Sequence, residues 1–141
     1  MKYEKKINYY ETDRMGITHH SNYIRYAEEA RVDILDKIGL PYSKIESEKV
    51  LIPVLEVKCK FKHSTTFEDI IVIDVKIKEF NGIRITFEYT MTKKETNDVV
   101  AIMESTHCFT DEHLKPINIK KIKPDWYEII DKLEKLEKSE K

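Results

Sequence analysis

Cysteine is scarce in this sequence. The chain has two cysteines in 141 residues, Cys59 and Cys108, which lie far apart and form no CxxC pair. That spacing excludes the cysteine patterns that mark zinc and redox sites. Both residues fall in apolar runs typical of strands, so we expect two buried free thiols.

An excess of charge of either sign is also missing. Lys and Arg together number 25 and Asp and Glu 26, which leaves a formal net charge of −1 at pH 7. This balance provides no general attraction to nucleic acid or to an anionic membrane. We therefore expect neither as a partner, and any binding of anions must come from a local patch of basic residues.

Long apolar runs are absent as well. The first ten residues, MKYEKKINYY, contain no stretch that would serve as a signal peptide, and no run approaches the ~18 apolar residues of a membrane span. A reducing cytoplasm is the expected location. The sequence has no internal repeats and no long linker, and its length suits one domain, so we predict a single domain over residues 1–141.

Hydrophobic periodicity predicts one long helix. Apolar side chains recur at i, i+3 and i+4 spacing over residues 23–38. Ser21 or Asn22 is a natural N-cap, and Gly39, closely followed by a proline, is a natural stop. A short helical turn is expected over residues 42–47.

Alternation of apolar and polar residues predicts strands on both sides of this helix. The pair Asn81-Gly82 separates two alternating runs, which is a strong signal for a hairpin turn. A second turn is expected near residues 96–98. The expected strands cover residues 3–10, 55–61, 71–77, 83–92 and 99–110.

The chain ends in a Lys- and Glu-rich tail over about residues 120–141, which we interpret as a structural amphipathic helix. The complete order is one strand, a long helix, four strands and this tail. It fits an α+β hotdog fold, in which a five-stranded antiparallel sheet curls around one central helix. One face of the sheet would meet the helix, and the other would meet solvent or a partner.

Polar residues crowd the loop between the first strand and the helix, over residues 11–22. A helix N-terminus presents unpaired N–H groups and the positive end of the helix dipole, so it can polarise a carbonyl. A carboxylate nearby can act as a general base or as a nucleophile. Hydrolysis needs both parts, and Asp13, with Glu11 as its rival, supplies the carboxylate.

The stretch YETDRMGITHHSNYIRY, residues 10–26, resembles the active-site signature of the 4-hydroxybenzoyl-CoA thioesterase family. The shared features are a Thr-Asp pair, a glycine three residues after the Asp, and an aromatic-rich helix; the resemblance extends over about residues 3–113. It implies a hotdog enzyme that hydrolyses an acyl-CoA thioester to a free acid and CoA. It also implies a homodimer or homotetramer with active sites at the subunit interface, and no metal or other cofactor.

The resemblance also implies roles for individual residues. Asp13 would be the catalytic carboxylate, as a nucleophile or as the base that activates water. The backbone N–H of His20 would polarise the thioester carbonyl, while its side chain helps to orient the substrate, and Gly16 would let the loop pass close to that substrate. The remaining expected substrate-binding residues lie at the helix start and on the following strand: Ser21, Asn22, Tyr23, Lys60 and Lys62.

Departures from the family pattern leave the acyl group open. Arg14 and Met15 stand where small residues or proline are common, and His19 stands where an aromatic residue is common.

Three alternatives concern side chains: Asp13 could only cap backbone amides, the adjacent histidines could join it in a metal site, and the lysines at 58, 60 and 62 could form a solvated face. Two concern function: a thioesterase for acyl-carrier protein, or a module that binds acyl-CoA without hydrolysing it.

Overall fold

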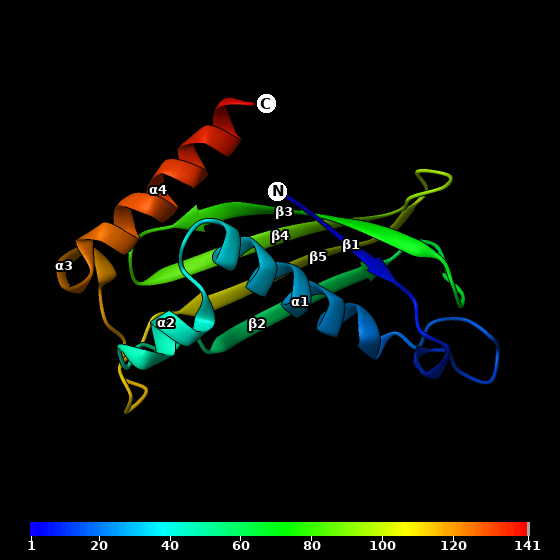
Figure 1. Ribbon diagram of the computed structural model, residues 1–141, viewed down its shortest axis with the longest axis horizontal. Helices are drawn as coiled ribbons and strands as arrows, with labels where there is room; N and C mark the ends of the chain where they lie inside the picture. The colour runs from blue at the N-terminus through cyan, green and yellow to red at the C-terminus, as the bar shows by residue number, and fades with distance from the viewer. Residues whose placement is uncertain (141) are drawn as a thin grey trace. The chain divides into compact units, whose positions relative to one another are not determined.

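A computed structural model describes residues 1–140. Its elements follow the predicted order: one strand, a long helix, four more strands and a helical C-terminal segment (Figure 1). The elements are β1 (Lys2–Lys6), a 3₁₀ helix η1 (Tyr9–Glu11), α1 (Ser21–Lys37), α2 (Tyr42–Ser47), β2 (Val54–Phe61), β3 (Ile70–Phe80), β4 (Arg84–Lys93), β5 (Val99–Cys108), α3 (Ile119–Ile122) and α4 (Pro124–Ser139).

The five strands form one sheet in the order β1-β3-β4-β5-β2. Strand β1 runs antiparallel to β3, with Tyr3 opposite Ile73. Short hairpins join β3 to β4 and β4 to β5. Next to the β2–β5 pair, Leu51 and Thr110 exchange both backbone hydrogen bonds across an antiparallel bridge. The sheet is therefore antiparallel, with β1 and β2 at its edges, and the predicted α+β hotdog arrangement is confirmed.

The residues fall into two compact units, of which the first comprises Met1–Ile34, Lys58–Val75 and Tyr89–Met103. Its core lies between the first turns of α1 and the sheet. Alternate residues of β3 are buried, as a period of two requires when one face of a strand is covered. Arg31 of α1 donates a hydrogen bond of 3.0 Å to the hydroxyl of Tyr89 on β4, which ties the helix to the sheet.

The second unit comprises Leu35–Val57, Lys76–Glu88 and residues 104–140. Its core is apolar and gathers side chains from α2, β4, the segment after β5, and α4. A backbone N–H of β3, from Ile77, donates to the Glu137 carboxylate of α4 at 2.9 Å, and this bond is buried. The predicted C-terminal helix thus exists and is docked in this unit. The apolar core residues include Leu40, Ile45, Ile85, Phe87, Phe109, Trp126 and Ile130.

The sequence prediction was wrong at the end of the first strand. We expected extended chain as far as residue 10, but β1 ends at Lys6 and residues 9–11 form η1. The cause is local, because the Glu11 carboxylate accepts the backbone N–H of Asn8 at 2.8 Å and closes a tight turn. The expected turn at residues 42–47 is confirmed as α2.

The two cysteines are free thiols, with Cys108 buried and Cys59 half-buried. Burial raises the pKa of the Cys59 thiol. Within residues 1–140, no helix combines the length and the apolar character needed to cross a membrane.

Candidate active site

Residues 12–18 form a small hairpin, here called the Asp13 hairpin. Asp13 donates its backbone N–H to the carbonyl of Ile17 at 2.8 Å, and the Gly16 N–H returns to the carbonyl of Asp13 at 2.9 Å. Gly16 has φ +79°, a conformation that suits glycine, and a Cβ there would meet no other atom within 4 Å. The glycine is therefore needed for the turn itself.

The turn holds the carboxylate of Asp13 in a defined position. One carboxylate oxygen, Oδ1, accepts the backbone N–H of Met15 at 2.8 Å. The other oxygen, Oδ2, has no hydrogen-bond partner in the described part of the chain. Asp13 is half-buried, so this open oxygen belongs to a fixed but accessible carboxylate.

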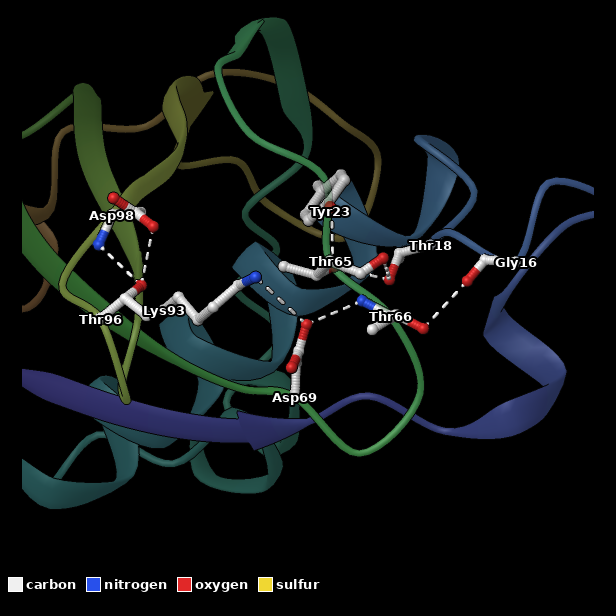
Figure 2. Close-up of polar contacts among 9 residues, drawn as sticks. All are labelled: Gly16, Thr18, Tyr23, Thr65, Thr66, Asp69, Lys93, Thr96 and Asp98. Carbon is white, nitrogen blue, oxygen red and sulfur yellow. Dashed lines mark hydrogen bonds and ion pairs between the residues drawn. The ribbon is translucent and has the colours of Figure 1, made fainter.

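The second arm of the Asp13 hairpin is fastened to the connection between β2 and β3 (Figure 2). Thr18 donates its backbone N–H to the Thr65 carbonyl at 2.8 Å, and Ile17 and Thr66 form an antiparallel bridge. The Thr66 hydroxyl donates to the carbonyl of Gly16 at 3.0 Å. These contacts extend the hairpin into a short three-stranded arrangement. Thr65 and Thr66 were not predicted from the sequence, because no local pattern links them to the loop.

The N-terminus of α1 follows directly. The His19 backbone N–H donates to the Glu11 carbonyl at 2.8 Å, and the carbonyls of His19 and His20 accept N–H groups from the first helical turn. The backbone N–H of His20 donates to no other group within residues 1–140. An open N–H at the start of a helix is the donor that polarisation of a carbonyl requires.

The predicted N-caps take other roles. Ser21 is the first helical residue, and its hydroxyl bonds Nδ1 of His19 at 2.9 Å. The Asn22 amide is buried and donates to the Glu11 carbonyl at 2.9 Å, which joins the two ends of the loop. Tyr23 is 4% exposed, and its hydroxyl bonds that of Thr65 at 2.8 Å. In this conformation Asn22 and Tyr23 support the loop from within the protein.

An open cavity of about 860 Å³ lies beside the loop and the helix start. Asp13 lines it together with His19, Ser21 and Asn22. His20 is absent from this lining: its ring stacks on His19, at 4.4 Å between centroids, and meets the edge of Phe61 at 6.0 Å. The histidine that shares the cavity with Asp13 is thus His19, which the sequence analysis did not include in the site.

Two residues that line the same cavity, Tyr26 and Glu29, each carry a buried polar atom without a hydrogen-bond partner within residues 1–140, the Tyr26 hydroxyl and Oε2 of Glu29. Tyr26 is 1% exposed. Burial raises the pKa of Tyr26, and the nearby Glu11 carboxylate raises it further. No hydrogen bond joins the two side chains. The other carboxylate oxygen of Glu29, Oε1, accepts a hydrogen bond from Nζ of Lys5 at 3.3 Å.

The predicted basic residues Lys60 and Lys62 are exposed, at the end of β2 and just beyond it. They do not line the cavity that contains Asp13. A separate open cavity of about 690 Å³ in the second unit is lined by both acidic and basic side chains, and by no residue of the Asp13 hairpin. Within residues 1–140, no group of three or more His, Cys, Asp or Glu side chains is arranged to hold a metal ion.

Comparison with known proteins identifies the family. Residues 7–130 match the thioesterase-like superfamily. A Bacillus subtilis protein, provisionally named acyl-CoA thioesterase YneP, is 30% identical over 134 residues, which is 95% of this chain and 97% of that protein. A provisionally named esterase of Aquifex aeolicus is 35% identical over 106 residues, covering 75% of this chain and 81% of its own length.

Solved structures agree with this relationship. The crystal structure of a DHNA-CoA thioesterase from Staphylococcus aureus superposes with a TM-score of 0.93 at 25% identity, over 99% of this chain and 94% of that one. The match spans the sheet, α1 and the C-terminal helix. The chain belongs to the thioesterase-like superfamily and is a thioester hydrolase with the hotdog fold.

Proposed function

We propose that this protein hydrolyses acyl-CoA thioesters to a free carboxylic acid and CoA, with Asp13 as its catalytic carboxylate. The observation that carries the proposal is the shared cavity: Asp13, with one oxygen open, lines it together with the first residues of α1. The names of the Bacillus subtilis and Staphylococcus aureus relatives support a CoA thioester as the substrate.

The proposed reaction uses two groups of the chain. The thioester carbonyl oxygen accepts the open N–H of His20, which stabilises the negative charge that develops on that oxygen. Asp13 removes a proton from a water molecule as that water attacks the carbonyl carbon, or attacks the carbon itself to form an anhydride that water then cleaves. In either route the C–S bond breaks, and the CoA sulfur leaves and takes up a proton.

We further propose that the protein works as a homodimer or homotetramer. Strand β2 is an edge of the sheet, and its apolar side chains are exposed in the single chain. An exposed edge with an apolar face is a surface that pairing with a second copy would cover. Light scattering of wild type beside Val57→Lys tests this, since a charge on that face is expected to shift the population toward monomer. The exposed apolar residues are Val54, Leu55, Val57 and Phe61.

Lys60 and Lys62 are proposed to attract the phosphates of CoA. Both are exposed and close in sequence to Phe61, which contacts the His20 ring at 6.0 Å. Replacing both lysines with Gln is expected to raise KM and weaken its salt dependence while kcat changes little. We also propose a reducing cytoplasm as the location.

The direct test is a thiol-release assay across a panel of aromatic, short-chain and long-chain acyl-CoAs. Wild type is expected to release CoA from at least one member, and Asp13→Asn to reduce kcat about 10²- to 10⁴-fold. Asn retains an oxygen to accept the Met15 N–H, so the turn should persist. The matched control is Asp36→Asn, an exposed carboxylate on the same helix that follows the hairpin, which should keep full activity.

Three outcomes would count against the proposal in different ways. Full activity in a folded Asp13→Asn variant would remove Asp13 from the mechanism. Turnover of acyl-carrier-protein thioesters but of no CoA thioester would redirect the substrate. Saturable binding of acyl-CoA without thiol release would indicate a binding module.

A further inference from the structure

Thr65 lies at a junction of three segments that are far apart in the sequence. It belongs to the connection between β2 and β3, and it is 1% exposed. Its hydroxyl oxygen lies 2.7 Å from that of Thr18 and 2.8 Å from that of Tyr23 (Figure 2). Thr18 ends the Asp13 hairpin and Tyr23 lies in the first turn of α1, so one buried hydroxyl joins the two. We call Thr18, Tyr23 and Thr65 the threonine clamp.

Every hydroxyl of the threonine clamp can be satisfied by one arrangement of protons. Tyr23 donates to the Thr65 hydroxyl oxygen, and Thr65 donates to that of Thr18. Thr18 then donates to the Thr65 backbone carbonyl, 3.3 Å away. Thr18 and Thr65 then each donate and accept a hydrogen bond and Tyr23 donates one, so rotation of any of these hydroxyls breaks a bond inside the protein.

The two segments joined by the clamp carry the two groups proposed for catalysis. Thr18 is paired with Thr12, the residue before Asp13, across an antiparallel bridge, and Asp13 itself bonds Ile17. On the other side, Tyr23 donates its backbone N–H to the His20 carbonyl at 3.2 Å. A shift at Thr65 would therefore change the position of the Asp13 carboxylate relative to the His20 N–H.

We propose that Thr65 is a positioning residue, which sets the distance between the Asp13 carboxylate and the open N–H of His20 through its hydroxyl group. The inference rests on the proposed catalytic roles of those two groups. Thr65 contacts neither directly and is not part of the signature in residues 10–26. Hydrolysis depends on both groups reaching the same carbonyl, so an error of about 1 Å in their separation is expected to lower turnover by up to ~100-fold.

The test compares Thr65→Val with Thr65→Ser. Valine keeps the shape of threonine but leaves the Tyr23 and Thr18 hydroxyls without their shared partner, whereas serine keeps the hydroxyl and loses a methyl group. We expect Thr65→Val to lower kcat about 10- to 100-fold with KM changed less than about threefold, and Thr65→Ser to retain kcat within about threefold of wild type. A general loss of packing would instead affect Thr65→Ser as well.

The matched control is Thr86→Val in the second unit, where the Thr86 and Thr106 hydroxyls lie 3.1 Å apart. That variant also breaks a bond between two threonines, one of them 9% exposed, and should leave kcat within about twofold of wild type. Equal kcat for Thr65→Val and wild type would overturn the proposal, as would equal losses in Thr65→Val and Thr65→Ser.

Amide hydrogen exchange separates this proposal from the proposed function. Thr65→Val should speed exchange at the Asp13 and Thr18 amides about tenfold, while Thr65→Ser leaves it unchanged. If wild type hydrolyses no thioester, the proposed function fails, and the exchange rates still decide whether Thr65 fixes the hairpin. Unchanged exchange in Thr65→Val would show that it does not.

Discussion

The polar groups on the two sides of the first turns of α1 differ in their hydrogen bonding. On one side, the hydroxyls of Thr18 and Tyr23 are buried and both bond the buried hydroxyl of Thr65. On the other side, Asp13 and Tyr26 line an open cavity, and neither Oδ2 of Asp13 nor the buried hydroxyl of Tyr26 has a partner within residues 1–140. Burying a polar group without a partner destabilises a fold, whereas a bonded network supports it. The bonded side therefore maintains the structure, and the open side carries the carboxylate that we propose acts on the substrate.

The largest effect is expected from removing the open N–H at the helix start. His20→Pro deletes that donor, and proline is tolerated where an N–H has no helical partner. We expect kcat to fall about 10²- to 10³-fold, the usual effect of losing one oxyanion donor. The measurement is thiol release with saturating acyl-CoA, together with circular dichroism to confirm the helix.

His20→Ala is the control for this prediction. It removes the imidazole and keeps the backbone N–H, so a donor role for the backbone predicts a much smaller loss than in His20→Pro. Equal losses in the two variants would assign the effect to the imidazole ring, which stacks on His19.

Removing one hydroxyl from the bonded side should lower the stability of the fold. Tyr23→Phe deletes the bond to Thr65 but leaves Thr65 bonded to Thr18. We expect the free energy of unfolding to fall by about 1 kcal/mol, and Tm by about 4 °C. Urea denaturation measures the first quantity and a thermal scan the second. A stability equal to wild type would mean that the Tyr23 hydroxyl contributes nothing to the clamp.

The two sides differ in how far a sequence can reveal them, for a physical reason. Asp13, Gly16 and His20 lie within eight residues, and turn chemistry and a helix start are local features of a sequence. The bond between Thr18 and Thr65 joins residues 47 positions apart, which no short pattern encodes. Strand β3 was predictable in the same local way, since its burial alternates with a period of two.

The errors in the prediction also have local physical causes. Residues 9–11 look like a strand, but the bond from Asn8 to the Glu11 side chain favours a tight turn. Along β2 the alternation predicted one covered face, whereas Leu55 and Val57 are exposed in the single chain. Periodicity identifies which residues share a face, but it does not identify what covers that face.

Tyr26→Phe tests the open side with the smallest change in shape. It removes a buried hydroxyl without a partner, so at neutral pH the free energy of unfolding should stay the same or rise by up to about 1 kcal/mol. A loss as large as that of Tyr23→Phe would show that the Tyr26 hydroxyl is satisfied after all. The measurement is urea denaturation of both variants in parallel.

Tyr26→Phe should also change how the free energy of unfolding depends on pH above pH 10. Burial and the Glu11 carboxylate raise the pKa of Tyr26 above its ordinary value of 10.0, so the folded state favours the neutral phenol. The stabilisation that the Tyr26 phenol contributes is fully present below pH 10. It is lost as the pH rises further, because Tyr26 ionises at a lower pH in the unfolded chain than in the folded one. Tyr26→Phe should therefore lose stability less steeply above pH 10, with Tyr3, whose pKa is also raised by burial, as a remaining contributor.

The smallest effect is expected where a hydroxyl holds the same hairpin from the surface. Thr66 is exposed and donates to the Gly16 carbonyl at 3.0 Å, so water can replace it as the donor. Thr66→Val should change the free energy of unfolding by about 0.5 kcal/mol or less and kcat by less than about twofold, as measured by urea denaturation and thiol release. Thr65 and Thr66 are neighbours that bond the same hairpin, and they differ mainly in burial. If Thr66→Val costs as much as Tyr23→Phe, burial is not what gives the threonine clamp its strength, and the surface bond holds the hairpin equally well.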